Sequence, residues 1–158
     1  MKKQVRMLFA AVLSSVMLTA CGEDPELAQF RHSIDEFCTR VSEIDTSINN
    51  IDAQSDNATT ELLSYLDELD LVFQSFARLD FPEEFDYLED LADESSEYMT
   101  KAVSSYHDAY GGDTYDPYSA EYAKQNYSRA YKRVQIIITF LHGEKPDDAD
   151  LTIEYEDK

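Results

Sequence analysis

The sequence predicts an all-α protein: an antiparallel up-and-down four-helix bundle, with an N-terminal leader before it and a short irregular acidic tail after it. Apolar residues recur at steps of three and four through four stretches, as on one face of a helix. The four prolines and four glycines fall outside these stretches, where helices begin or end. Strand-like alternation is confined to Leu151, Ile153 and Tyr155 in the tail. The predicted domain covers residues 21–145.

The leader is predicted to be a secretory signal peptide over residues 1–20. Lys2, Lys3 and Arg6 precede twelve uncharged residues, positions 7–18, with the sequence MLFAAVLSSVML. A helix that spans a bilayer needs about 20 apolar residues. A run of twelve after a basic start is instead typical of the hydrophobic centre of a cleaved signal.

The next residues, Leu18-Thr19-Ala20-Cys21, resemble the lipobox of bacterial lipoproteins, which signal peptidase II cleaves before the cysteine. The resemblance covers only the first 21 residues. It implies that Cys21 is the first residue of the mature chain and carries the lipid (palmitate), which anchors the protein to the cell membrane or outer membrane on the extracytoplasmic side. Firm anchoring takes more than one acyl chain. The alternative is an ordinary signal with an incidental cysteine.

The first two helices are predicted over about 25–51 and 57–79. Asp24 is placed to cap the first helix, with Pro25 in its first turn, only three residues after Cys21. That short distance predicts a protein that works close to its membrane. The apolar seam of the first helix is Leu27, Phe30, Ile34, Phe37, Val41, Ile44, Ile48 and Ile51, and that of the second is Leu62, Leu66, Leu69, Phe73 and Phe76.

The third and fourth helices are predicted over about 81–110 and 117–142. Asp80 and Glu83 have the spacing of a capping box, and Asp116-Pro117 repeats the device of the first helix. Their seams are Phe85, Leu88, Ala92, Met99, Ala102, Tyr106 and Ala109, then Ala123, Tyr127, Ala130, Val134, Ile137 and Leu141. Amphipathic helices joined by short turns predict a closed bundle and a monomer. A three-helix bundle with one dissociable helix is the alternative, and a dimer a lesser one.

Ile136 and Phe140 lie off the fourth seam, so we expect them to face outward in a simple bundle. Either the tail, residues 146–158, folds back over them through Leu151, Ile153 and Tyr155, or they mark a partner surface.

The charge balance is strongly acidic, with 33 Asp and Glu against 13 Lys and Arg and a net charge of −20. Without the leader's three basic residues the balance is 10 − 33 = −23. Nucleic acid and anionic lipid headgroups are poor partners for such a surface. We therefore expect no nucleic-acid partner, and a membrane contact made through the lipid.

No cofactor, metal site or catalytic group is expected. A di-metal bundle needs Glu-x-x-His pairs, and none of His32, His107 and His142 has a glutamate three residues before it. A haem held by Met99 and His142 is conceivable, but the two belong to no motif. Cys38 is expected to be a half-buried thiol. Because nucleophile and phosphate-binding motifs are also missing, we expect a protein that is not an enzyme.

An acidic stripe of five carboxylates at helical spacing is predicted along the third helix: Glu83, Asp86, Asp90, Asp93 and Glu97. Like charges at this spacing repel. Neutralisation by the basic residues of the fourth helix is the preferred interpretation (Lys124, Arg129, Lys132 and Arg133), and a cation or a basic partner is the alternative. Asp113, Asp116 and Glu121 lack the ligand spacing of an EF-hand loop.

Tyrosines concentrate around the turn between the third and fourth helices, where residues 106–131 hold seven of the eleven. Tyrosine offers rigid area with a polar tip, suited to peptides, glycans or protein surfaces. The candidate binding surface is Tyr106, Tyr110, Tyr115, Tyr118 and Tyr122. The alternative is that these rings only close the end of the bundle.

These observations predict a lipid-anchored extracytoplasmic protein that acts as a non-enzymatic interaction or binding module at the cell envelope, with an envelope protein or glycan as partner. The alternative is a lipoprotein that binds a small ligand or cation through the acidic stripe or the tyrosine-rich end.

Overall fold

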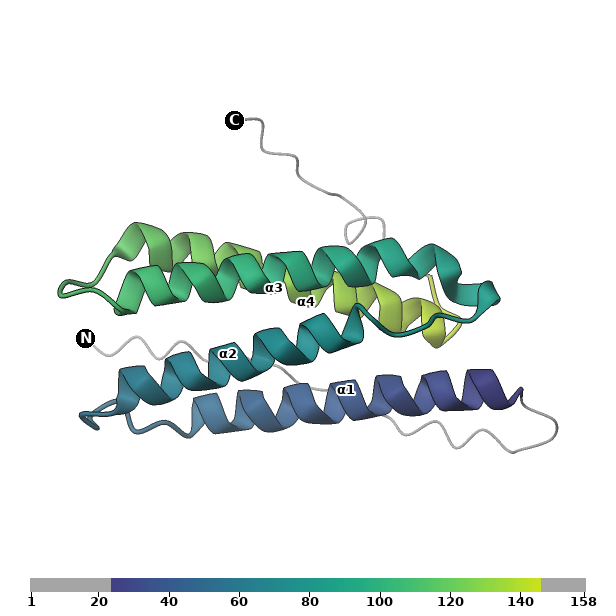
Figure 1. The fold of residues 1–158 in the computed structure, drawn as a ribbon, viewed down its shortest axis with the longest axis horizontal. Coiled ribbons are helices and arrows are strands. Elements are labelled where there is room, and N and C mark those ends of the chain that lie inside the picture. Colours follow the sequence, from purple (N-terminus) through teal and green to yellow (C-terminus); the bar gives the residue numbers. More distant parts are fainter. Residues whose placement is uncertain (1–23, 146–158) are drawn as a thin grey trace, which may run out of the picture.

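The computed structural model describes residues 24–145. Its elements are α1 (Pro25–Asn49), α2 (Ala58–Phe76), the short 3₁₀ helix η1 (Glu83–Leu88), α3 (Glu89–Tyr110) and α4 (Pro117–Leu141). Figure 1 shows the four long helices side by side, each antiparallel to the next along the chain. The predicted all-α four-helix bundle is confirmed. The expected leader, Cys21 and the tail 146–158 lie outside the described residues.

Two helix starts form as their capping residues predict. The Asp24 carboxylate accepts the Glu26 N–H at 3.1 Å, and the Asp116 carboxylate accepts the Tyr118 N–H at 3.0 Å. A proline follows each cap. Each carboxylate therefore satisfies one of the backbone donors that a helix start leaves without an intrahelical acceptor.

The predicted start of the third helix is wrong. Residues 83–88 form η1, whose N-cap is Pro82 without a side-chain cap, so the Asp80–Glu83 capping box does not start the helix. The Phe85 N–H bonds the Pro82 carbonyl at 2.7 Å, which is the tighter turn of a 3₁₀ helix. Burial of Phe81 and Leu88 favours this turn by drawing both ends of the segment into the core.

Among the other helix bounds, the start of α1, the end of α3 and the start of α4 match the expected residues, and the rest differ by one to three residues. α1 ends at Asn49 rather than 51, and α2 covers 58–76 rather than 57–79. Residues 77–79 remain close to the core although they are not helical, since Leu79 packs against it. Such shifts are usual where helix ends fray.

The α3–α4 pair packs through small residues. Fully buried small side chains alternate along the two facing helices: Ala92, Ser95, Ala102 and Ala109 of α3, with Ala123 and Ala130 of α4. Small residues let two backbones approach closely. The α1–α2 pair packs instead through large rings, with the centroid of Phe37 4.2 Å from that of Phe76 and 5.3 Å from that of Phe73.

Ile136 is only 5% exposed, so the expectation that it faces outward is wrong. Phe140 is half-buried, and its ring meets the edge of the Tyr87 ring of η1 at 5.7 Å. The prediction that the tail covers these residues lies outside the described part of the chain. Among residues 24–145, no helix has both the length and the apolar composition required to cross a bilayer.

Candidate functional site

The candidate binding surface surrounds the α3–α4 turn. Figure 1 places this turn at the same end of the bundle as the α1–α2 turn, opposite the start of α1. Asp116 closes the turn: its N–H bonds the Ala109 carbonyl at 3.0 Å, and its carboxylate accepts the Ser119 hydroxyl at 2.7 Å. The bonds from Ser119 and Tyr118 lower the pKa of Asp116. This carboxylate therefore works as a helix cap within the turn.

The five candidate tyrosines divide into a half-buried base and an exposed rim. Tyr106 and Tyr110 are half-buried, with ring centroids 6.3 Å apart, and the Tyr115 ring lies 5.2 Å from that of Tyr110. Tyr115, Tyr118 and Tyr122 are 57%, 86% and 51% exposed. Burial, with nearby Tyr110 and Glu121, raises the pKa of Tyr106 to about 12, so its hydroxyl stays neutral. Ring contacts thus join Tyr106, Tyr110 and Tyr115 in a row that ends in an accessible ring.

Two further tyrosines of the same sequence cluster point into the core. Tyr127 and Tyr131 of α4 are 7% and 6% exposed. Their hydroxyls donate to the Asp45 carboxylate of α1, at 2.9 Å from Tyr127 and 3.1 Å from Tyr131. Burial raises the pKa of Asp45, and the two tyrosine bonds partly offset that rise. These tyrosines link α1 to α4 and are not part of the binding surface.

The sequence did not predict the cluster that Asp45, Tyr127 and Tyr131 form, here called the Asp45 cluster. Its signal is weak: Asp45 follows the seam residue Ile44, and Tyr127 and Tyr131 stand four residues apart on α4. Spacing alone does not say which acid faces which helix, so only the assembled bundle identifies the partners.

The acidic stripe is exposed along all five residues, but it does not follow one regular helix. Glu83 and Asp86 belong to η1, whereas the other three belong to α3. From α4, Arg133 bonds Glu94 at 2.9 Å. Glu94 lies beside the stripe and is not one of its five residues, so this contact does not confirm the predicted neutralisation of the stripe itself. Within α3, Lys101 pairs with Glu97 at 3.5 Å. The Lys101–Glu97 pair is exposed on both sides, so it contributes modestly to stability. In the other pair the Arg133 side chain is only 6% exposed, so its buried charge depends on Glu94 as a partner.

A hollow of 620 Å³ opens at the other end of the molecule, where α1 begins and η1 passes. Its lining is largely acidic: Asp24, Glu26, Leu27, Pro82, Glu83 and Glu84. Residues 24–145 contain no group of three or more His, Cys, Asp or Glu side chains placed to hold a metal ion.

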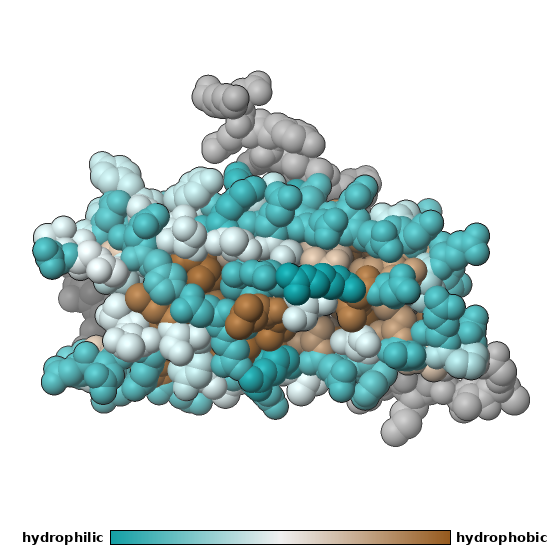
Figure 2. Space-filling view, in the orientation of Figure 1, coloured by the Kyte–Doolittle hydropathy of each residue, from teal (hydrophilic) through white to brown (hydrophobic). Residues whose placement is uncertain are grey.

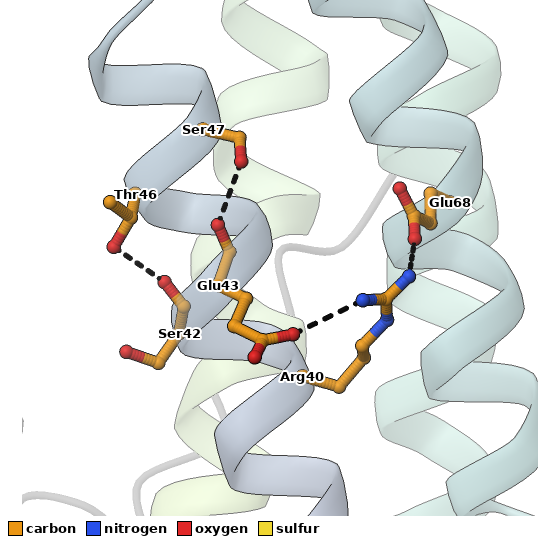
Figure 3. A network of polar contacts seen from close by, with 6 residues as sticks. All are labelled: Arg40, Ser42, Glu43, Thr46, Ser47 and Glu68. Carbon is orange, nitrogen blue, oxygen red and sulfur yellow. Dashed lines mark hydrogen bonds and ion pairs between the residues drawn. The ribbon is translucent and has the colours of Figure 1, made fainter.

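A shallow groove of 390 Å³ runs between α1 and α2. Phe37, Val72, Phe76 and Leu79 line it, and Leu71 stands at its side 62% exposed. Figure 2 shows apolar residues as a band between hydrophilic rows on the face seen there. Figure 3 shows Arg40 of α1 reaching both Glu43 on its own helix and Glu68 of α2. An ion pair thus joins the two walls of the groove.

The residues weighed for catalysis or cofactor binding lie in different surroundings. Met99 is fully buried in the core, while His142 is exposed at the end of α4. The His107 Nε2 lies 2.6 Å from the Asp67 carboxylate, which links α3 to α2. Burial, and to a lesser degree the charge of Asp35, raises the pKa of the Cys38 thiol to about 11. A thiol with such a pKa is a poor nucleophile at neutral pH.

Comparison with protein-family models, with curated proteins and with solved structures finds no match to this chain. Its function is therefore inferred from its own residues.

Proposed function

We propose that the protein is a lipid-anchored module of the cell envelope that binds a partner, without catalysis, through its tyrosine-rich end. One observation carries the proposal: Tyr115, Tyr118 and Tyr122 are large and exposed, and their positions in the α3–α4 turn and the first two turns of α4 place all three at one end of the bundle. Exposed aromatic residues grouped in this way are typical of interaction sites.

The proposed anchor would lie near the start of α1, at the opposite end of the bundle from the proposed binding surface. Cys21 would precede Asp24, the cap of α1, by three residues. α1 has 25 residues, which corresponds to about 37 Å of helix. Anchored by its N-terminus, the bundle would thus hold the tyrosine-rich end about 37 Å from the attachment point. We propose that the bundle stands away from the membrane, which would place the partner farther from it than the short Cys21-to-Asp24 distance alone predicts.

The acidic residues near the start of α1 support attachment through lipid alone. Asp24, Glu26, Glu83 and Glu84 surround the hollow at this end. Their charge opposes direct contact with anionic headgroups. We propose that the lipid supplies the membrane affinity while this end of the protein body stays off the headgroups.

A cation-binding function is the second candidate, because the same acidic hollow shares Glu83 with the exposed acidic stripe. Carboxylate oxygens are the ligands that Ca²⁺ prefers. This candidate would place the active surface at the opposite end from the tyrosines, so the two functions are separable by substitution.

Site-specific photocrosslinking in living cells tests the binding surface. Benzoylphenylalanine in place of Tyr118 should capture one reproducible partner, whereas the same group in place of Tyr87 should not. Tyr87 is a matched control because it is 56% exposed and lies in η1, at the other end. Equal adducts from both positions, or none from either, would argue against the tyrosine-rich end as the binding surface.

Membrane fractionation tests the anchor. Cys21→Ser should release the protein from the membrane or leave an uncut precursor. A processed Cys21→Ser protein that stays on the membrane would refute lipid attachment at this residue.

A further inference from the structure

We propose that the partner bound at the tyrosine-rich end is cationic, a polypeptide segment that presents Lys or Arg side chains to the exposed rings. This inference rests on the proposed function and adds the chemical class of the partner. It follows from two independent observations, the distribution of charge over the bundle and the way another tyrosine of the same chain is already contacted.

The end of the bundle that carries the tyrosines has acidic but no strongly basic side chains. Residues 41–77, which include the α1–α2 turn, contain neither Lys nor Arg, and neither do residues 102–123, which include the α3–α4 turn. Exposed carboxylates occupy both turns and the adjoining helix ends: Asp52, Asp56, Asp108, Asp113 and Glu121. His107 is the basic side chain beside the turn, and it faces Asp67.

The nearest lysines in the sequence offset this charge only in part, since Lys124 lies three residues after Glu121, the spacing of neighbouring side chains on a helix. Lys124 lies two residues after Tyr122 on α4, and side chains at that spacing point to different faces of a helix. Lys101 lies before the region on α3, where it pairs with Glu97. The field at the tyrosine-rich end is therefore negative, and it attracts cations while repelling anionic glycans and nucleic acid.

Tyr98 shows within this protein how cations contact a tyrosine face. Its ring centroid lies 5.1 Å from the Arg133 guanidinium, 5.3 Å from the Lys101 ammonium and 5.8 Å from the Arg129 guanidinium. A cation within about 6 Å of an aromatic centroid is attracted by the electron-rich face of the ring. Three of the chain's basic residues thus gather at one half-buried tyrosine on the α3–α4 face.

The rings at the end of the bundle offer the same chemistry to an outside partner. Tyr115, Tyr118 and Tyr122 are each more than half exposed, and in the sequence Asp113 lies two residues before Tyr115 and Glu121 directly before Tyr122. A Lys or Arg side chain can lie against a ring while its charge faces a carboxylate. A segment with several such side chains would engage several rings at once, which favours a basic polypeptide over a neutral sugar.

Calorimetric titration with a defined peptide tests the inference. The full chain in detergent is titrated with an acetylated (Gly-Arg)₄ amide at moderate salt, with (Gly-Glu)₄ as the opposite-charge control. The site variant is Tyr115→Leu, Tyr118→Leu, Tyr122→Leu, which keeps apolar area but removes the aromatic faces. The matched control is Tyr87→Leu at the other end, and circular dichroism verifies that both variants fold.

The expected result is binding of (Gly-Arg)₄ alone, weakened about two- to fivefold for each ring removed, and changed less than twofold by Tyr87→Leu. A second variant, Asp113→Asn with Glu121→Gln, should weaken binding and reduce its salt dependence. Equal affinities for the parent chain and the triple variant would overturn the inference, because the peptide would then be sensing only the overall charge.

The outcomes also separate this inference from the proposed function. If Tyr118 captures a partner in cells but the triple variant binds (Gly-Arg)₄ as well as the parent chain does, the binding surface stands and the cationic class is wrong. If Tyr118 captures nothing beyond the Tyr87 control, the proposed function itself fails.

Discussion

Asp45 is a half-buried carboxylate whose main partners are two buried hydroxyl groups, those of Tyr127 and Tyr131. The arrangement connects α1 to α4 with polar atoms inside an otherwise apolar interface. Hydrogen bonds to charged groups contribute more than bonds between neutral ones, and removing one partner leaves the other short of a bond. Substitutions here should therefore affect stability more than their small change in volume suggests.

Tyr127→Phe should lower the free energy of unfolding by about 1–2 kcal/mol at neutral pH, because the Asp45 carboxylate loses a bonded hydroxyl. Tyr122→Phe is the control on the same helix, since its ring is 51% exposed and water replaces the hydroxyl's partners. Urea unfolding followed by circular dichroism measures both. Equal effects of the two substitutions would show that the Tyr127 hydroxyl adds nothing to stability.

Asp45→Asn should change how stability depends on pH. Burial raises the pKa of Asp45 in the folded protein, so the folded state holds the proton more tightly than the unfolded state does. The contribution of protonated Asp45 to the free energy of unfolding is complete below the ordinary aspartate pKa of about 3.9. This contribution is lost as pH rises through the raised pKa of Asp45 in the folded protein. The unfolding free energy of the parent chain, relative to that of Asp45→Asn, should therefore fall as pH rises from about 4 through the raised pKa of Asp45. Parallel urea curves across this range would contradict the raised pKa.

The helices follow from the sequence because their signals are local. The steps of three and four in the α1 seam identify its buried face, and Asp24 and Asp116 mark two helix starts by capping chemistry. The 3₁₀ conformation of residues 83–88 cannot be predicted from the sequence in this way, because it depends on the burial of Phe81 and Leu88 in the core. The capping-box spacing of Asp80 and Glu83 is the same whether or not that tertiary contact forms.

The α3–α4 turn needs glycine at one of its two adjacent positions. A Cβ on Gly111 would lie 2.6 Å from the His107 carbonyl oxygen, whereas one on Gly112 would meet nothing closer than 3.6 Å. Gly111→Ala should therefore lower the unfolding free energy by about 1 kcal/mol or more, because backbone must shift. Gly112→Ala should be neutral or slightly stabilising through its effect on the unfolded chain. Thermal unfolding of the pair measures the difference, and equal melting temperatures would contradict the close approach.

At the scale of the whole bundle, the sequence predicts that tyrosines concentrate at one end, but it does not predict which of them are buried and which are exposed. Seven tyrosines lie close together in the chain, yet two are buried against Asp45, two form a half-buried base and three are exposed. The helical phase of each ring relative to α1 decides between these environments. The separation of this end from the start of α1 likewise depends on how the four helices run, which only the assembled fold shows.

The net charge of −20 should make the stability of the whole molecule depend on salt. Self-repulsion opposes the compact state, so raising NaCl from about 20 mM to 0.5 M, which shortens the Debye length severalfold, should raise the melting temperature by a few degrees. Calcium chloride at matched ionic strength distinguishes screening from a cation site. If the acidic stripe is a solvated face, any extra stabilisation by Ca²⁺ should be the same in the parent chain and in Asp90→Asn, Asp93→Asn. Loss of that extra stabilisation in the variant would instead support the cation-binding function, since a bound ion stabilises only the state that holds it.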